Sequence, residues 1–185
     1  MAILTRGQFR SIAESKSGYR GLTGYVNENR TYSKSAATTS IFLSHSHYDK
    51  DVVEQAKIFF ENLGISIYVD WADETMPERT NGTTANKIKN QIISVNDKFV
   101  LLATNNAVNS KWCNWEVGIA DPFKLPKKKF AILPLANNSG SWDGNEYLQI
   151  YPRIEKNPRE SGGEGYYVWY PDNTWETIEN WLRKL

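Results

Sequence analysis

The stretch Ser40-Ile-Phe-Leu-Ser-His-Ser-His-Tyr-Asp49 decides the fold of this 185-residue chain. Its first five residues form a short, nearly continuous apolar run, which is typical of a strand buried on both faces of a sheet. Ser46 offers an N-cap for a following helix, with Asp49 three residues later. Apolar residues then recur at helical spacing over positions 52–63, and Gly64 can end that helix. The stretch therefore predicts a buried strand that leads directly into a helix.

The same alternation of strand and helix continues along the chain. Further strands are predicted at residues 65–69, 98–103, 129–134 and 166–170. Further helices are predicted from Thr83 or Thr84 to about 95, from Asn109 or Ser110 to about 120, before Pro122, and from Asp172 or Asn173 to about 182. This pattern predicts an α/β fold, with a doubly wound parallel sheet of about five strands and helices on both faces. Ligands of such sheets bind where the strands end, which points to residues 44–48, 70–82 and 104 onward.

The chain divides into two parts of different composition. Residues 1–39 are predicted to be an N-terminal extension, rich in basic residues, Ser, Thr and Gly, with room for a short helix near residues 5–16. Residues 40–185 are predicted to be one domain, interrupted by a Gly/Asn/Ser/Pro-rich loop insertion at 136–165. Trp142, Tyr147 and Tyr151 within this loop predict that it is partly packed.

Charge and cysteine content limit the classes of partner and compartment. The net charge is +1, so no large field of one sign points to nucleic acid or to a membrane surface. The single cysteine, Cys113, rules out an intrachain disulfide and favours a reducing compartment. No apolar run is long enough to cross a bilayer, and no signal peptide is recognisable. We therefore expect a cytoplasmic protein that acts without nucleic acid or membrane.

The turn Ser44-His-Ser-His-Tyr-Asp49 is the first candidate site. His45 and His47 before Asp49 resemble a metal-binding loop, but the chain has only 2 His, so a complete metal site is not expected. One alternative is a polar turn whose side chains satisfy the N–H groups of a helix end. The same turn would suit a phosphate or a ribose, because free N–H groups and the helix dipole favour an anion there.

The segment Trp112-Cys-Asn-Trp-Glu116 is the second candidate. On a helix, Trp112 and Glu116 lie on the same face, one turn apart. An aromatic ring there can stack on a flat substrate and can partly desolvate the carboxylate. The alternative from spacing alone is a core tryptophan beside a surface glutamate.

The pair Asp70-Trp71, at the end of the second predicted strand, is the third candidate. An acidic group and an indole at the carboxyl end of a strand fit the rim of a binding site, although a solvated Asp that caps a turn explains the pair almost as well. The chain has no Gly-x-Gly-x-x-Gly, no Walker loop and no nucleophile-elbow sequence. Kinase, dehydrogenase and hydrolase-fold functions therefore lose support.

Taken together, three motifs resemble those of bacterial TIR (Toll/interleukin-1 receptor-like) domains. The stretch 41–51 resembles their first strand and turn, 64–71 their second strand entering the variable BB loop, and 110–118 the helix with their Trp-x-x-x-Glu pattern. The motifs occur in the family's order and spacing over roughly residues 40–135. The chain is similar to TIR proteins of the NAD-cleaving type, including the Thoeris-type proteins of anti-phage defence.

This resemblance implies a flavodoxin-like sheet and an enzyme that cleaves the nicotinamide–ribose bond of NAD. The products would be nicotinamide and ADP-ribose or a cyclic ADP-ribose-type signal. The family's catalytic glutamate corresponds to Glu116. The substrate-binding positions correspond to Ser44, His45, Asp70, Trp71 and Trp112. NAD would be the substrate, with no metal and no further cofactor. The resemblance also implies self-association through the BB loop and a downstream effector that senses the nucleotide product.

Two alternatives to this function remain open from the sequence. Many TIR domains are catalytically silent assembly modules, because a fold does not by itself establish an activity. A nucleoside-deoxyribosyltransferase-like enzyme would share the fold class and a glutamate, but would act on free nucleosides.

Overall fold

A mixed sheet runs through the computed structural model, which describes residues 3–17, 39–69, 81–144, 146–159 and 162–184. The strands are β1 (Leu4–Thr5), β2 (Ser40–Ser44), β3 (Ser66–Tyr68), β4 (Lys98–Ala103), β5 (Phe130–Ala136), β6 (Arg153–Pro158), β7 (Glu164–Trp169) and β8 (Trp175–Thr177). The α-helices are α1 (Arg6–Ser17), α3 (Lys50–Glu61), α4 (Gly82–Asn90), α5 (Asn105–Val108), α6 (Lys111–Lys124) and α7 (Ile178–Arg183). Short 3-10 helices occur at η2 (His47–Asp49) and η5 (Glu146–Ile150), and a π-helical turn, η4 (Gln91–Val95), extends α4.

The sheet has the order β3-β2-β4-β5-β6-β7-β8, and β1 also pairs with β5. The strands from β3 to β6 are parallel, whereas β6, β7 and β8 are antiparallel to one another. The predicted α/β class and parallel arrangement are confirmed, but the sheet has eight strands instead of about five. Of the additional strands, β6 lies within the predicted loop 136–165 and β8 within the predicted last helix. Strand β6 was missed because the surrounding Gly, Asn and Pro resemble a loop, and β8 because its residues were assigned to the last helix.

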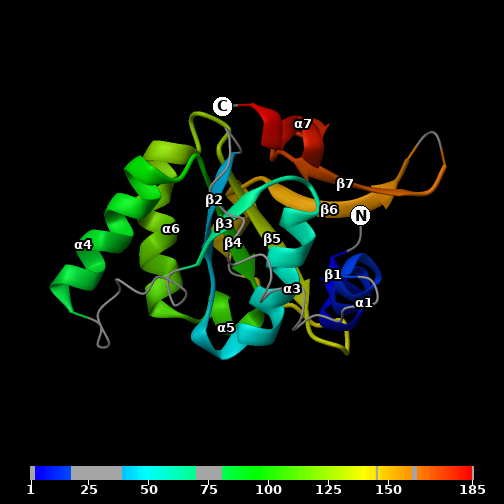
Figure 1. The fold of residues 1–185 in the computed structure, drawn as a ribbon, viewed down its shortest axis with the longest axis horizontal. Coiled ribbons are helices and arrows are strands. Elements are labelled where there is room, and N and C mark those ends of the chain that lie inside the picture. The colour runs from blue at the N-terminus through cyan, green and yellow to red at the C-terminus, as the bar shows by residue number, and fades with distance from the viewer. Residues whose placement is uncertain (1–2, 18–38, 70–80, 145, 160–161, 185) are drawn as a thin grey trace.

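Helices cover both faces of the sheet, as predicted (Figure 1). On one face, residues of α1, α3 and α7 share an apolar core with alternate residues of β2, β4 and β5. On the other face, residues of α4, η4 and α6 form a second core with the intervening residues of the same strands. Successive side chains of a strand point to opposite faces, so these central strands are buried on both sides. No helix in the described part of the chain has the length and apolar character needed to span a bilayer.

The helix ends follow the predicted caps only in part. The hydroxyl of Ser110 caps α6, as predicted, by accepting a hydrogen bond from the Cys113 N–H at 3.3 Å. The predicted end before Pro122 is wrong, because α6 continues to Lys124, whose ammonium group donates to the Asn96 carbonyl oxygen at 2.5 Å and anchors the last turn.

The starts of α4 and α7 also differ from the prediction. Asn81 caps α4 in place of Thr83 or Thr84, and Thr84 completes a capping box with it. The cap of α7 is Thr177, because Asp172 accepts a hydrogen bond from the Thr174 N–H in a turn that leads into β8.

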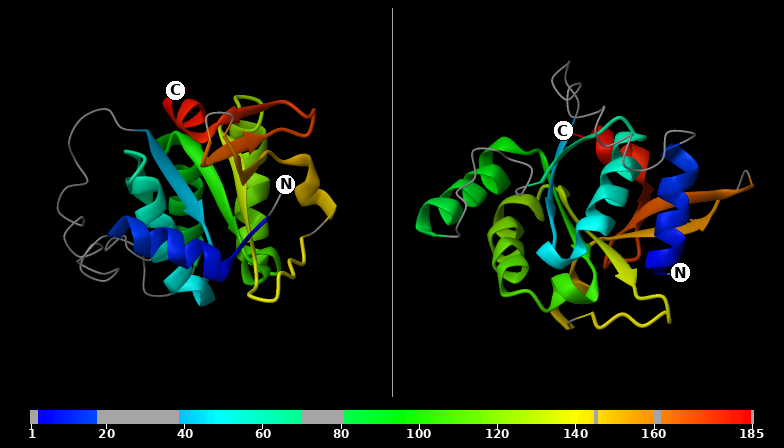
Figure 2. Two further views of the ribbon diagram at one scale, coloured as in Figure 1. Left: turned by 90° about the vertical axis from the view of Figure 1, so that its right-hand side faces the viewer. Right: turned by 60° about the horizontal axis from the view of Figure 1, so that its bottom comes forward.

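The first part of the predicted extension packs onto the rest of the molecule (Figure 2). Leu4 and Thr5 of β1 pair with Leu135 and Ala136 of β5. In the following helix, α1, Phe9 is fully buried and its ring lies 5.7 Å from that of Phe59 in α3. Residues 3–17 therefore contribute a short strand and a helix to the packed body of the molecule.

Candidate functional site

A buried carboxylate lies at the carboxyl end of β2. The Ser44 hydroxyl, at the last position of β2, donates a hydrogen bond of 2.5 Å to Oε2 of Glu116 in α6. Both side chains are almost completely buried, at 1% and 2% exposure. Two candidates that are 72 residues apart in the sequence are thus in direct contact, at the edge of the sheet where ligands of this fold class bind.

The register of α6 explains why Glu116 points inward. Cys113, Val117 and Ala120 are the buried apolar residues of this helix, and Glu116 lies on the same stripe. The alternative of a surface glutamate beside a core tryptophan is therefore wrong. A carboxylate away from bulk water interacts more strongly with a nearby positive charge than it would in solution.

Trp112 lies one helical turn before Glu116, as predicted. Its ring is partly buried against the apolar core on the α6 face of the sheet. Trp115 packs beside it, with ring centroids 4.9 Å apart and the rings tilted by 36°, and is 36% exposed. The two indoles form an aromatic surface at the start of the helix that carries the buried carboxylate.

His45 follows Ser44 directly and is partly buried. Its Nδ1 lies 2.9 Å from the Leu43 carbonyl oxygen. A carbonyl can only accept, so Nδ1 carries the proton of this hydrogen bond, and in the neutral ring Nε2 is the nitrogen that can accept. The other two predicted substrate-side residues, Asp70 and Trp71, lie outside the described residues.

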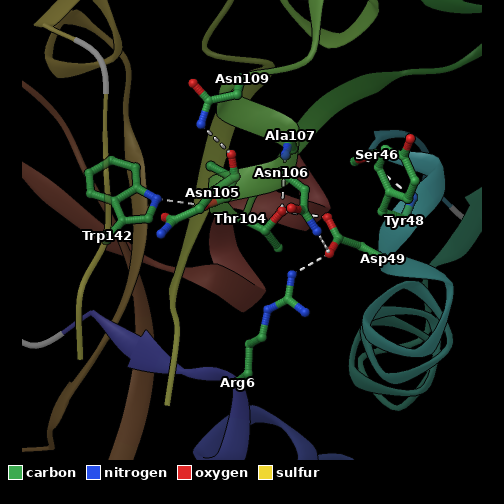
Figure 3. Close-up of polar contacts among 11 residues, drawn as sticks. Arg6, Ser46, Tyr48, Asp49, Thr104, Asn105, Asn106, Ala107, Asn109 and Trp142 are labelled. Carbon is green, nitrogen blue, oxygen red and sulfur yellow. Dashed lines mark hydrogen bonds and ion pairs between the residues drawn. The ribbon is translucent and has the colours of Figure 1, made fainter. Parts of the chain in front are cut away.

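A second buried carboxylate, Asp49, connects three segments next to Ser44 (Figure 3). Its oxygens accept hydrogen bonds from the Thr104 hydroxyl at 2.5 Å and from the Asn106 amide at 2.8 Å, and Arg6 forms an ion pair with it. Asp49 is fully buried, and Thr104 also caps α5 through the Ala107 N–H. The side chain holds the turn after β2, the turn after β4 and the start of α1 together.

Sequence reasoning missed this role of Asp49. The sequence suggested only a capping position three residues after Ser46, whereas Ser46 caps η2 by accepting from the Tyr48 N–H at 3.4 Å. The sequence signal that could have revealed this contact is Thr104, a polar residue directly after a buried strand. Nothing local pointed to Arg6, which lies 43 residues away in the sequence.

A cavity of about 390 Å³ opens beside this network. It is lined almost entirely by uncharged polar side chains from the ends of β2 and β4: Ser46, His47, Tyr48, Asn105, Asn106, Asn109 and Ser110. Tyr48 is 74% exposed at the surface of this region. Hydroxyl and amide groups of this kind suit the hydroxyls of a sugar, and the segments that line the cavity lead to Ser44 and to Glu116.

The loop between β5 and β6 packs against the carboxyl edge of the sheet and against α6. The Trp142 indole donates to the Ala103 carbonyl oxygen at 2.6 Å, at the end of β4. The hydroxyls of Tyr147 and Tyr151 donate to Asn114 at 2.5 Å and to Asp121 at 2.7 Å, both in α6. Burial raises the pKa of Tyr151, and its bond to Asp121 raises that pKa further. These contacts fix the helix that carries Glu116 against the sheet.

A family model and two known proteins match this chain. A family model described as the TIR domain matches residues 41–155. A protein of Bacillus cereus (strain MSX-D12), named "Probable 3' cyclic ADP-D-ribose synthase ThsB'", is 32% identical over 149 residues, which cover 78% of this chain and 75% of that protein. A protein of Cytobacillus dafuensis, named "Putative cyclic ADP-D-ribose synthase TIR2", is 30% identical over 95 residues, which cover 50% of this chain and 24% of that protein.

Proposed function

Because this chain belongs to the TIR domain family, we propose that it cleaves the nicotinamide–ribose bond of NAD with Glu116 as its catalytic carboxylate. The observation that carries the proposal is the contact of Glu116 with Ser44 at the carboxyl edge of the sheet, 2.5 Å between oxygens. The names of the two relatives, each a cyclic ADP-D-ribose synthase, favour a cyclised product over linear ADP-ribose.

The chemistry of NAD explains why one carboxylate suffices. The leaving group is a cationic pyridinium, so the C–N bond breaks with its electron pair moving to nitrogen, and neutral nicotinamide departs without protonation. Positive charge then develops on the ribose ring. A preorganised carboxylate in a site of low dielectric stabilises that charge, by analogy with glycoside hydrolysis. No metal and no further cofactor is needed for this step.

The neighbouring residues take supporting roles in the proposal. Ser44 holds one oxygen of Glu116 in a fixed orientation. The indole of Trp112 supplies a surface on which nicotinamide or adenine stacks. His45, Asp70 and Trp71 remain predicted substrate contacts.

The acceptor of the ribosyl cation decides the product. Attack by water gives ADP-ribose, and attack by a hydroxyl of the same molecule gives a cyclic isomer, with the attacking O–H releasing its proton in both cases. Attack by a ring nitrogen also gives a cyclic isomer, with the positive charge passing to the ring. Exclusion of water favours the cyclic product. We propose that the BB-loop segment after β3 provides this exclusion and also mediates self-association, and that the product is a signal read by an effector in anti-phage defence.

Glu116→Gln tests the proposal, since it keeps the shape of the side chain and removes the charge. We expect nicotinamide release from NAD to fall by about 100-fold or more, because the interaction lost is made with the transition state. Products are separated by liquid chromatography after incubation with NAD and, in parallel, with deoxynucleosides. Glu14→Gln, at an exposed carboxylate on α1, is the matched control and should retain full activity.

The remaining outcomes discriminate the alternatives. Turnover of NAD by Glu116→Gln at the wild-type rate would remove the assigned role. No nicotinamide release by the wild-type protein at any concentration would indicate an assembly module. Base exchange between deoxynucleosides would indicate a deoxyribosyltransferase.

A further inference from the structure

A groove of about 460 Å³ lies at the far end of the sheet, beside β7, β8 and α7. It is lined by aromatic, polar and charged side chains: Arg159, Tyr166, Tyr167, Trp175, Thr177, Glu179, Asn180 and Arg183. None of these residues belongs to the candidate active site, and β8 is the last strand in the sheet order, three strands beyond β5. The volume falls within the range of about 300–1,000 Å³ that is usual for small-molecule sites.

One wall of the groove is aromatic. The rings of Tyr167 and Trp175 meet edge to face, with centroids 5.2 Å apart and an interplanar angle of 83°. Trp175 is 50% exposed. A large indole held by a neighbouring ring but open to solvent is a platform on which a flat heterocycle can stack.

The other side of the groove carries a net positive charge. Two arginines, Arg159 and Arg183, and one carboxylate, Glu179, line it. The Arg159 guanidinium lies 3.3 Å from that carboxylate, which is long for a charge-assisted hydrogen bond. Two guanidinium groups against a single loosely paired carboxylate suit a phosphate, which arginine binds with paired donors.

In β7, Gly165 lies directly against the side chain of Arg159. A Cβ atom on Gly165 would lie 2.6 Å from Nε of Arg159, so a larger residue here would force the Arg159 side chain to move from its present position. In the described part of the chain, β8 pairs with β7 only from Tyr167 to Trp169, so the strand does not cover this position.

We propose that this groove binds a nucleoside phosphate, with the base stacked on Trp175 and the phosphate held by Arg159 and Arg183. The site is separate from Glu116 and would sense a nucleotide independently of its turnover. The groove combines an aromatic surface with two arginines. Its ligand must therefore carry both a flat ring and an anionic group.

The test uses ADP as the probe, titrated into the full chain by calorimetry, with backbone amide shifts mapped by NMR. We expect shifts centred on Tyr167, Trp175 and Asn180, and affinity at least about tenfold lower in Trp175→Ala. Arg183→Gln should weaken ADP similarly, and adenosine without phosphate should bind less tightly than ADP. Phe123→Ala and Arg10→Gln, which alter an exposed aromatic ring and an exposed Arg–Glu pair elsewhere, are the controls and should bind as wild type.

Gly165→Ala provides a second test that removes no ligand contact. The added methyl group displaces the Arg159 side chain, so ADP should bind several-fold more weakly while the thermal unfolding temperature stays close to that of the wild type. Glu116→Gln should bind ADP in the groove unchanged, which separates this proposal from the catalytic one. The proposal is overturned if millimolar ADP causes no shifts in β7, β8 and α7, or if Trp175→Ala and Gly165→Ala bind it as the wild type does.

Discussion

The two ends of the parallel strands bury opposite charges. At the carboxyl edge lie Asp49 and Glu116, which are 0% and 2% exposed, and at the amino edge lie Lys98 and Lys124, which are 0% and 6% exposed. Helix α6 joins the two edges, with Glu116 in its second turn and Lys124 at its end.

The buried charges are held in different ways. The ammonium groups donate to backbone carbonyls, Lys98 to Lys184 O at 2.6 Å and Lys124 to Asn96 O at 2.5 Å. The carboxylates instead accept from side chains, such as Ser44 and Thr104. Backbone partners are fixed by the fold itself, whereas side-chain partners come from separate segments and can be changed one at a time. The comparison indicates that single substitutions can remove the partners of the carboxylates at the carboxyl edge, whereas the backbone partners of the lysines at the amino edge stay in place.

The largest expected effect is on stability, from Asp49→Asn. The substitution leaves Arg6 facing an amide in a buried network, so we expect the free energy of unfolding to fall by about 3 kcal/mol. Urea denaturation measures this change. Arg6→Met, at a side chain that is 30% exposed, should give a smaller loss. Equal stability of Asp49→Asn and the wild type would show that the contacts of the Asp49 carboxylate do not stabilise the fold.

Ser44→Ala should give an intermediate effect, on activity instead of folding. Loss of the hydroxyl leaves Glu116 in place but less well oriented, so we expect kcat for nicotinamide release to fall about tenfold to 100-fold. KM and the urea midpoint should change little. This prediction rests on the proposed NAD cleavage. A change confined to KM would assign Ser44 to substrate binding instead.

The smallest expected effect comes from Lys98→Met at the amino edge. Burial lowers the pKa of Lys98 to about 8, from 10.5. Because the unfolded chain then binds more protons than the folded one between these values, wild-type stability should rise with pH across that window, relative to Lys98→Met. The relative gain should not exceed about 1 kcal/mol per pH unit, measured by urea denaturation at pH 7 and at pH 9.5. The prediction is contradicted if the free energies of unfolding of the two proteins change with pH in parallel.

The central part of the fold could be predicted because its signals are local. The apolar runs at 40–44 and 98–103 are short and nearly continuous, and their short length favours buried strands over helices. Glu116 could be singled out because its Trp-x-x-x-Glu motif lies within one helix and resembles that of TIR domains, whereas its spacing alone left a surface glutamate open. The apolar runs and this motif each lie within a stretch of about ten residues.

The remaining features depend on contacts between distant segments. The ion pair of Arg6 with Asp49 joins residues 43 positions apart, and neither has a sequence neighbour that indicates the other. Strand β6 pairs with β5 only at Ile132 and Arg153, and is otherwise stabilised by its antiparallel partner β7. Its sequence, Arg-Ile-Glu-Lys-Asn-Pro, shows no apolar–polar alternation, so packing, not local preference, determines this strand.

The bond from the Trp142 indole to the carbonyl oxygen of Ala103 makes that tryptophan an intrinsic optical probe of the carboxyl edge of the sheet. Any rearrangement that pulls the β5–β6 loop from the end of β4 must break this bond and expose the ring, which shifts indole fluorescence to longer wavelength. In a chain whose other six tryptophans are replaced by phenylalanine or tyrosine, a single emission band would then report this rearrangement in real time.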